Sequence, residues 1–268
     1  VDRYVADYAA GLNPNPCIEC NRHIKFQKLL DRADLLGFDV IATGHHAAIT
    51  SHGSELFLTR GADAAKDQSY VLHMLGQSQL RRLMLPVGAM TKEAVREIAQ
   101  DRGLVTAGKP DSQDVCFIHS KGGRQTFLGD RIALTPADVV TTSGKRVGSV
   151  QSVELVTVGQ RRGLDVGGNT GRKYVTDIDR TSNTITIGDR SGTLRPSVQL
   201  HSFVWAHQPV EGSVVAQFSA HGATAPANLS LDSNSGELTW DTAQVAVAPG
   251  QSVVFYDDDR VLGGALAS

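Results

Sequence analysis

The sequence reads Asn13-Pro-Asn-Pro-Cys-Ile-Glu-Cys-Asn-Arg-His-Ile-Lys-Phe26 close to its start, and this stretch holds two of the three cysteines, Cys17 and Cys20. Proline fixes φ and lacks an N–H donor, so the loop before the cysteines is predicted to be stiff and not helical. Apolar residues then recur at helical spacing, which predicts an amphipathic helix over residues 22–36 that ends at Gly37. A stiff loop would thus deliver two thiols to the start of a helix, where unpaired amides and the helix dipole lower the pKa of a thiol.

The third cysteine, Cys116, lies in the stretch Lys109-Pro-Asp-Ser-Gln-Asp-Val-Cys-Phe-Ile118. An apolar run that begins at Val115 predicts a short strand, which the acidic, polar segment directly precedes. A buried small hydrophobe is the alternative for a single cysteine. We predict that the fold brings Cys20 and Cys116 together over a substrate.

Cys17, Cys20 and His23 form a C-x2-C-x2-H pattern that allows more than one chemistry. They could bind zinc together with Cys116 or a histidine at 45–46, although zinc usually takes four ligands and the sequence has no second C-x2-C pair. The two cysteines could instead cycle through a disulfide. A packing role is the third interpretation, and the polar, proline-rich surroundings argue against it.

The bulk composition is that of an ordinary globular protein. The chain has 268 residues, 41% of them hydrophobic and 20% charged, which allows two or three domains with real cores. A formal net charge of −2 excludes a global basic field, so recognition of RNA would depend on local patches. An odd number of cysteines is not typical of a secreted disulfide framework, and no apolar run is long enough for a membrane span. We therefore expect a cytoplasmic protein with no membrane association.

The first part of the chain predicts the helix, strand and polar loop that build an open α/β sheet. The loop Thr43-Gly-His-His46 follows a predicted strand at its carboxyl end, where such sheets bind ligands. The expected elements are a helix over 1–9 with Gly11 as its C-cap, a strand over 38–42, a hairpin with strands 47–50 and 56–59, a helix that begins at 66–70, and a helix that Thr91 caps and that ends near Gly103, with Val95, Ile98 and Ala99 on its inner face.

The pattern changes after about Phe127, where Thr, Val, Gly and Ser become frequent and short alternating runs appear. We predict strands at 174–178, 184–187, 214–219, 227–231, 237–240 and 252–256, separated by Asp- and Ser-rich turns. These strands indicate one or two small β-domains, with a boundary near residues 193–196.

Two polar segments could bind a nucleotide or RNA, and each has a plainer interpretation. Lys66-Asp67-Gln68 offers a cation, an anion and an amide, or simply a solvated helix start. The loop Gly159-Gln160-Arg161-Arg162-Gly163 suits phosphate contact, and Arg172-Lys173 adds to the basic patch, although surface arginine pairs are common.

Taken together, these segments resemble one family, the bacterial tRNA-specific 2-thiouridylases of the MnmA or TrmU type. The segments that carry the resemblance occur in the family's order and at its spacing. They are residues 13–26, Ile41-Ala-Thr-Gly-His45, Lys66-Asp-Gln-Ser-Tyr70, Leu85-Pro86 with Met90-Thr-Lys-Glu93, Lys109-Pro-Asp-Ser-Gln113 with Cys116-Phe-Ile118, and Val158-Gly-Gln-Arg-Arg-Gly-Leu164.

The resemblance implies an α/β plus β fold: a partial Rossmann-like adenylation (PP-loop ATPase) domain over residues 1–127, a central tRNA-binding domain over 128–194 and a C-terminal β-barrel over 195–268. It also implies a reaction. ATP with Mg2+ activates O2 of the wobble uridine of tRNA, and a persulfide sulfur from a donor protein then replaces that oxygen to form 2-thiouridine. No permanent cofactor and no bound metal is expected.

The family's site residues carry over by position. Cys116 matches the persulfide carrier and Cys20 the nucleophile, and the two can close a disulfide as sulfur is released. Gly44 matches a backbone contact to ATP. The matches to target-base and tRNA contacts are Asn15, Pro16, Cys17, Lys66, Asp67, Gln68, Gln160, Arg161 and Arg162. The implied partners of a monomeric enzyme are tRNA of the Lys, Glu and Gln types and a sulfur-relay protein or cysteine desulfurase.

Some features depart from the family. Its Ser-Gly-Gly-x-Asp-Ser phosphate loop has no match here, so we expect the chain to begin inside the adenylation domain, and without that loop we expect it not to bind or cleave ATP properly and to be inactive by itself. The central domain's His-x-Gly falls on Val150-Gln-Ser152, and an arginine of the barrel falls near Ser219. The alternatives are a non-catalytic tRNA-binding remnant and a zinc-stabilised RNA-binding protein.

Overall fold

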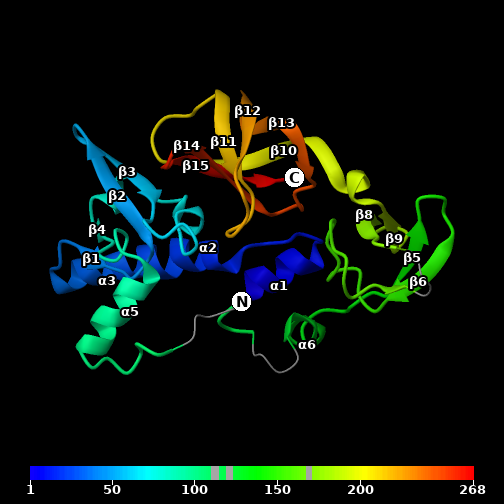
Figure 1. Cartoon of the computed structure of the whole chain (residues 1–268), viewed down its shortest axis with the longest axis horizontal. Helices are drawn as coiled ribbons and strands as arrows, with labels where there is room; N and C mark the ends of the chain where they lie inside the picture. Colours follow the sequence, from blue (N-terminus) through cyan, green and yellow to red (C-terminus); the bar gives the residue numbers. More distant parts are fainter. Residues whose placement is uncertain (110–114, 119–122, 167–170) are drawn as a thin grey trace.

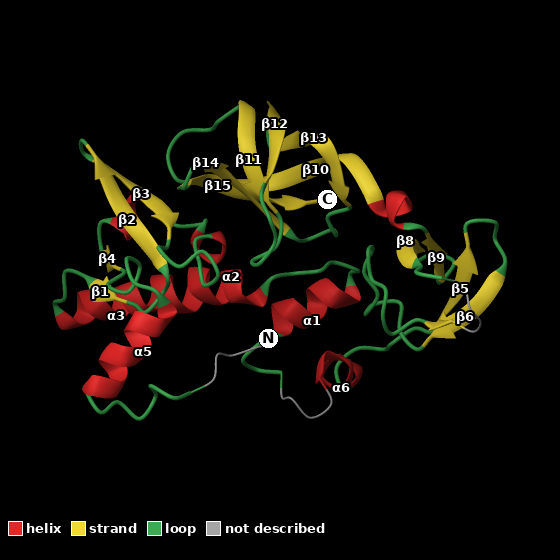
Figure 2. Cartoon of the chain, viewed as in Figure 1, coloured by secondary structure: helices red, strands yellow, loops and turns green. Residues whose placement is uncertain are grey.

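The computed structural model describes residues 1–109, 115–118, 123–166 and 171–268. The chain folds into an N-terminal helical part, a small central sheet and a C-terminal barrel (Figures 1 and 2). Three kinds of fold unit expected from the sequence, an α/β part, a central β part and a barrel, are therefore confirmed.

The cysteine segment is helical from its second proline onward. Helix α1 spans Asp2–Ala9, and Gly11 follows with a left-handed φ of 83°. Helix α2 spans Pro16–Cys20, a π-helix spans Asn21–Lys28 and α3 spans Leu29–Leu36, which ends at the left-handed Gly37. The predicted end was right and the predicted start at residue 22 was wrong. A proline is well tolerated in the first helical turn, so Pro16 begins the helix instead of preventing it.

The parallel sheet of the N-terminal part is smaller than predicted. Strand β1 covers only Ile41–Ala42 and pairs with β4, Leu83–Met84. The predicted strand over 38–42 was wrong at its start, where the side chains of Phe38 and Val40 are 61% and 44% exposed. An apolar run predicts burial only if another layer covers it, and no described element covers these two side chains.

Two helix predictions for this part need correction. Residues 66–70 begin no α-helix: a turn leads into the short 3-10 helix at Tyr70–Leu72, followed by α4 at Gln77–Leu80. Helix α5, Lys92–Asp101, is capped by Thr91 as predicted, but Ile98 on its supposed inner face is 44% exposed. Helix α6 spans Gly123–Gly129.

The central sheet has the order β7-β6-β5-β9-β8, with β5 and β9 parallel and the other pairs antiparallel. Its buried aliphatic side chains form a core of their own, centred on Val139, Val175 and Ile185. The strands are β5 Ala137–Thr141, β6 Arg146–Val150, β7 Asp165–Val166, β8 Tyr174–Asp179 and β9 Thr184–Gly188, and the 3-10 helix Arg190–Thr193 leads to the barrel.

The barrel closes because β10 pairs with both β13 and β15. The predicted strands at 214–219, 227–231, 237–240 and 252–256 are confirmed, within a few residues, as β11, β12, β13 and β14. The sequence analysis missed β10 and β15, and β15 contains the pair Gly263-Gly264. The strands are β10 Leu194–Trp205, β11 Gly212–Gln217, β12 Ala225–Asp232, β13 Ser235–Val245, β14 Ser252–Asp257 and β15 Arg260–Ala267.

The predicted N-terminal hairpin exists, but it belongs to the barrel sheet. Strands β2, Ala47–His52, and β3, Glu55–Arg60, pair with each other, and Thr59 of β3 pairs with Arg260 of β15. One hydrophobic core therefore runs from the cysteine helix to the barrel, where Phe26 and Tyr256 both lie in it. This shared core holds the barrel against the N-terminal part.

A buried polar network reinforces this junction. The Asp67 carboxylate accepts hydrogen bonds from Arg60 Nη1 (2.9 Å), from the Gly61 and Ser69 amides (2.9 and 3.1 Å) and from Ser69 Oγ (2.6 Å). Arg60 lies 3.9 Å from the centre of the Tyr256 ring and donates to Gln217 Oε1 on β11 at 3.0 Å. Arg60 thus connects the loop at residues 63–69 to the barrel.

The network predicts an unequal cost for breaking two ion pairs. The Asp67 side chain is only 6% exposed, so Arg60→Met leaves a buried carboxylate without its cation and should lower the free energy of unfolding by about 3 kcal/mol. The matched control is Arg146→Met, whose partner Asp138 is 53% exposed, with an expected loss of about 0.5 kcal/mol or less. Urea unfolding measures both; equal losses would contradict the assigned role of Arg60.

Candidate active site

The start of helix α2 positions two of the thiols. Asn15 is the N-cap, and its side-chain oxygen accepts a hydrogen bond from the Cys17 amide at 3.1 Å. Cys17 and Cys20 then lie at positions i and i+3, which share one face of a helix. Cys17 is exposed and Cys20 is half-buried, so both thiols can meet a substrate.

Cys116 is held by its neighbours in a turn, not in the strand that we predicted. The Ile118 amide donates to the Val115 carbonyl at 2.9 Å, which closes the turn. Phe117 packs edge-on against Tyr4 of α1, with ring centres 5.3 Å apart. These flanking side chains take the place of strand pairing, and Cys116 itself stays exposed. The preceding residues 111–114, part of the polar run, lie outside the described residues.

The surroundings of the Cys17 thiol change its pKa. Burial raises the pKa of the Cys17 thiol, the nearby Cys116 and Cys20 thiols raise it further, and Lys25 opposes them by lowering it. The expectation that the helix start lowers the thiol pKa is therefore wrong for Cys17. All three cysteines are free thiols in the structure. Cys17 is consequently protonated at neutral pH, between two other sulfurs.

Lys25 and His45 form the next layer of the site. The Lys25 ammonium lies 3.5 Å from His45 Nε2, and His45 Nδ1 lies 2.9 Å from Thr43 Oγ1. Burial lowers the pKa of His45 to about 4, and Lys25 and His46 add to the effect. A neutral His45 can accept from Lys25 through Nε2 and donate to Thr43 through Nδ1. Gly44, beside it, is exposed with an open surface above its Cα.

In the segment Lys66-Asp67-Gln68, the side chains of Asp67 and Gln68 form hydrogen bonds within the protein. The Asp67 carboxylate is satisfied by the junction network. Gln68 and His46 form two hydrogen bonds. The Gln68 side-chain oxygen accepts from the His46 backbone amide (2.9 Å), and the Gln68 backbone amide donates to the His46 carbonyl (2.8 Å). The Gln68 side chain therefore holds the loop at residues 43–46, the Asp67 carboxylate holds the segment at residues 60–69, and Lys66 is half-buried beside them.

The loop at residues 159–163, which we predicted to contact phosphate, also has one side chain that is bonded within the protein and others that are exposed. Gln160 serves the loop itself, since its side chain accepts from the Thr157 amide (3.1 Å) and donates to the Arg162 carbonyl (2.8 Å). Arg161 and Arg162 are exposed, and within the described ranges neither side chain forms an ion pair. The two arginines are thus available for an external anion.

The zinc interpretation finds no support in the described ranges, where no group of three or more His, Cys, Asp or Glu is arranged to hold a metal ion. His23 instead contacts Glu19 (3.4 Å) and Gln27 (3.2 Å) on its own helix. None of the described helices is long and apolar enough to cross a membrane.

Sequence analysis missed Lys25, Arg60 and Tyr256. For Lys25 a signal exists, because it follows Cys17 on the same helix at two successive i to i+4 steps through Asn21. Arg60 and Tyr256 are brought together only by the pairing of β3 with the barrel, and no local pattern shows this.

Comparisons with known proteins cover the whole chain. Family models match at residues 1–120 (tRNA methyl transferase HUP domain), 125–189 (tRNA methyl transferase PRC-barrel domain) and 195–267 (aminomethyltransferase beta-barrel domain). The tRNA-specific 2-thiouridylase MnmA of Acidothermus cellulolyticus is 42% identical over 99% of this chain and 74% of its own length. The proteins of that name from Herpetosiphon aurantiacus and Chloroflexus aurantiacus are 39% and 42% identical, over 100% and 98% of this chain and 76% and 75% of their own lengths.

The lowered histidine pKa predicts a pH dependence. A folded-state pKa of about 4 for His45, against an ordinary 6.5, means that the unfolded chain binds more protons between these values, so stability falls as pH falls through this window. At about pH 5 the loss from His45 alone should be about 2 kcal/mol. NMR titration of the imidazole protons, with His45→Asn to assign the signal, measures it. A midpoint near 6.5 would contradict the buried, neutral His45.

The thiol cluster predicts how alkylation of Cys17 responds to its neighbours. Lys25→Met removes the cation that lowers the Cys17 pKa, so Cys17 should react more slowly with iodoacetamide at a given pH. Cys116→Ser removes a neighbouring thiol that raises it, so Cys17 should react faster. Lys28→Met, an exposed lysine on the same helix, is the control. Mass spectrometry of peptides gives the rates, and opposite signs for the two variants are required.

Proposed function

This chain belongs to the MnmA family of tRNA-specific 2-thiouridylases, and from that premise we propose that it transfers sulfur to C2 of the wobble uridine of tRNA. The observation that carries the proposal is the gathering of exposed or half-exposed thiols at the start of α2 beside Cys116. We assign residues 1–127 to a catalytic domain, 128–194 to a central tRNA-binding domain and 195–268 to the barrel. We propose further that the enzyme is cytoplasmic and monomeric.

The first step activates the uridine. Its O2 attacks the α-phosphorus of ATP, pyrophosphate leaves, and the base carries AMP on O2, because a carbonyl oxygen is otherwise a poor leaving group. Mg2+ would accompany the ATP as part of the substrate. The exposed backbone at Gly44 is the proposed contact to ATP, and the Gln68–His46 pair holds the loop that carries it.

The second step delivers sulfur. A sulfur-relay protein or cysteine desulfurase loads Cys116 with a persulfide, and the exposed position of Cys116 leaves room for a protein donor. The terminal sulfur attacks C2 and AMP leaves, so that the base is joined to Cys116 through a disulfide. The Cys20 thiolate then attacks the Cys116 sulfur, which forms a Cys20–Cys116 disulfide and releases the 2-thiouridine.

Asn15, Pro16 and Cys17 are the proposed contacts to the target base. A raised pKa keeps Cys17 as a neutral thiol, which suits a packing or weak hydrogen-bonding contact better than a general base. The proposed tRNA contacts that carry a positive charge are Arg161 and Arg162, which are exposed, and Lys66, which is half-buried. Asp67, Gln68 and Gln160 form hydrogen bonds within the protein, and we propose that they act on tRNA by shaping the loops that carry these contacts.

A non-catalytic tRNA-binding protein is the second candidate. Two observations favour it. The side chains of Gln160 and Asp67 are used in hydrogen bonds within the protein, and the arginine of the family's barrel falls near Ser219. Both observations reduce the number of polar groups available to tRNA. The domain descriptions speak of methyl transfer, but a cluster of thiols suits sulfur transfer better.

The proposal predicts which cysteines sulfur transfer needs. Cys116→Ser and Cys20→Ser should each abolish 2-thiouridine formation, because the persulfide carrier or the releasing thiol is lost. Cys17→Ser should reduce the rate much less. The protein, and a version extended with a relative's phosphate-loop segment, is incubated with ATP, a persulfide donor and unmodified tRNA for Lys, Glu or Gln. Mass spectrometry of the nucleosides detects the product.

All variants should bind tRNA like the wild-type protein, which separates loss of chemistry from loss of binding. Near-normal thiolation by either serine variant would remove the role assigned to that cysteine. Tight tRNA binding without product in the extended protein would favour the non-catalytic candidate.

A further inference from the structure

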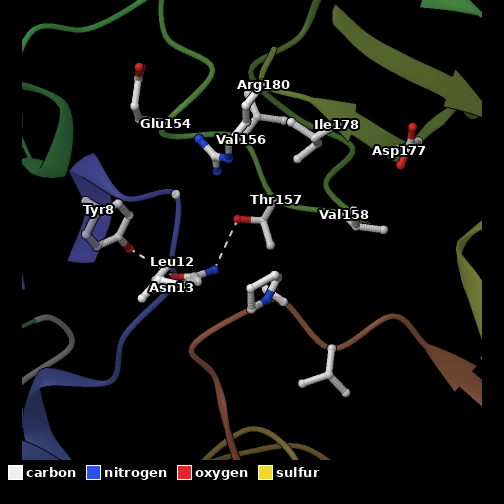
Figure 3. A pocket seen from close by; sticks show the side chains of 14 residues that line it. Tyr8, Leu12, Asn13, Glu154, Val156, Thr157, Val158, Asp177, Ile178 and Arg180 are labelled. Carbon is white, nitrogen blue, oxygen red and sulfur yellow. Dashed lines mark hydrogen bonds between the residues drawn. The ribbon is translucent and has the colours of Figure 1, made fainter. Parts of the chain in front are cut away.

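A pocket of about 210 Å³ lies where the N-terminal part, the central sheet and the barrel meet. Tyr8 lines it from α1, Asn13 from the α1–α2 connection, and Thr157 and Arg180 from the central part (Figure 3). Pro249 lines it from the barrel. This volume is below the ~300–1,000 Å³ of drug-sized pockets, so it suits one planar ring and not a whole nucleotide triphosphate.

The exposed side chain of Arg180 lies over Gly11 at the rim of this pocket. A Cβ at Gly11 would lie 2.7 Å from Arg180 Nε and 2.9 Å from its Cδ, so a larger residue would displace the arginine from this position. Gly11 also has a left-handed φ of 83°, which glycine adopts most readily. Among the residues that the structure describes, Arg180 forms no ion pair and no side-chain hydrogen bond. The Arg180 guanidinium therefore lines the pocket with its donors available.

The polar wall below Arg180 offers both donors and acceptors. Tyr8 OH donates to Asn13 Oδ1 (3.1 Å), and Asn13 Nδ2 donates to Thr157 Oγ1 (3.3 Å). Tyr8 OH can therefore still accept a hydrogen bond, while the second amide proton of Asn13 and the Thr157 hydroxyl proton can still be donated. A mixed set of this kind, beside apolar walls that include Leu12 and Pro249, matches the edge and faces of a nucleobase.

The two carboxylates of the pocket lining do not oppose an anion at Arg180. In Figure 3 the side chains of Asp177 and Glu154 point away from the space that the guanidinium faces. Glu154 is fixed in that direction, because its carboxylate accepts from the Thr135 amide (3.0 Å) and from Ser152 Oγ (2.8 Å). The charge that meets a ligand inside the pocket is therefore positive.

The pocket also lies between two segments to which the proposed function gives tRNA contacts. Asn13 directly precedes the segment with Asn15, and its amide donates to the Pro249 carbonyl of the barrel at 2.7 Å. Thr157 leads into the loop with Arg161, and its amide is held by Gln160 at 3.1 Å. An RNA strand that touches both segments would therefore lie close to this pocket.

We propose that the pocket formed by Tyr8, Asn13, Thr157 and Arg180 binds a second unpaired nucleotide of the tRNA, close to the target uridine. The base enters the pocket and meets the Asn13 and Thr157 donors, and a phosphate of the same nucleotide meets Arg180. The inference rests on the proposed function and extends it, since the enzyme would bind the anticodon loop at a second site.

The test compares two arginines of the central part. Arg180→Met is measured against Arg190→Met, an exposed arginine that does not line the pocket. The probe is an anticodon stem-loop RNA that carries the fluorescent base 2-aminopurine at one unpaired position at a time. Affinity is measured over a range of salt concentrations, and thermal melting checks that both variants fold.

In the wild-type protein, one unpaired position besides the target uridine should change its fluorescence on binding. Arg180→Met should bind the RNA about tenfold more weakly, lower the salt slope by about 0.7 and abolish that fluorescence change. Arg190→Met should bind within about twofold of the wild-type protein, because an exposed charge outside the contact is largely screened.

Two results would overturn the inference in distinguishable ways. If the wild-type protein binds the stem-loop but Arg180→Met behaves like Arg190→Met, the pocket is not a nucleotide site and the proposed function stands. If the wild-type protein binds the stem-loop no better than an unrelated hairpin, the proposed function fails and the nucleotide pocket fails with it.

Discussion

The burial of the Asp67 carboxylate is the constraint on which the site depends. A carboxylate taken out of water must be met by donors, and here Arg60, Ser69 and the Gly61 amide supply them. Arg60 also reaches Gln217 of the barrel, so this charge pair joins the barrel to the N-terminal part beside the shared hydrophobic core. The next residue, Gln68, then aligns the loop that carries Gly44 with the same framework.

The thiols are placed by a different means. Helix capping by Asn15 fixes Cys17 and Cys20 relative to each other, whereas Cys116 depends on the aromatic contacts of its neighbour Phe117 with α1. One pair is thus set by backbone geometry and the third thiol by side-chain packing. This arrangement suits the proposed reaction, in which Cys116 meets a donor protein and then approaches Cys20, because a turn held by a few ring contacts can shift more easily than a helix.

The three parts of the chain meet closely at the pocket. Asn13 contacts both Thr157 of the central part and the Pro249 carbonyl of the barrel, and Gly159 packs on Val245. Each part therefore contributes to a surface that none of them forms alone. A long polymeric substrate such as tRNA can use such a surface, since it contacts several parts of the protein at once.

The sequence by itself determined the features with local causes: the left-handed Gly37 that ends α3, the Thr91 cap of α5, the strands β8, β9 and β11 to β14, and the motifs that indicate the family. Only the tertiary structure decided that β1 is short, that Arg60 joins the barrel and that Arg180 faces a pocket. Caps and alternation depend on neighbours along the chain, where propensity is strong. Strand pairing and buried charge depend on residues far apart in sequence, whose encounter is fixed by the packing of the whole fold.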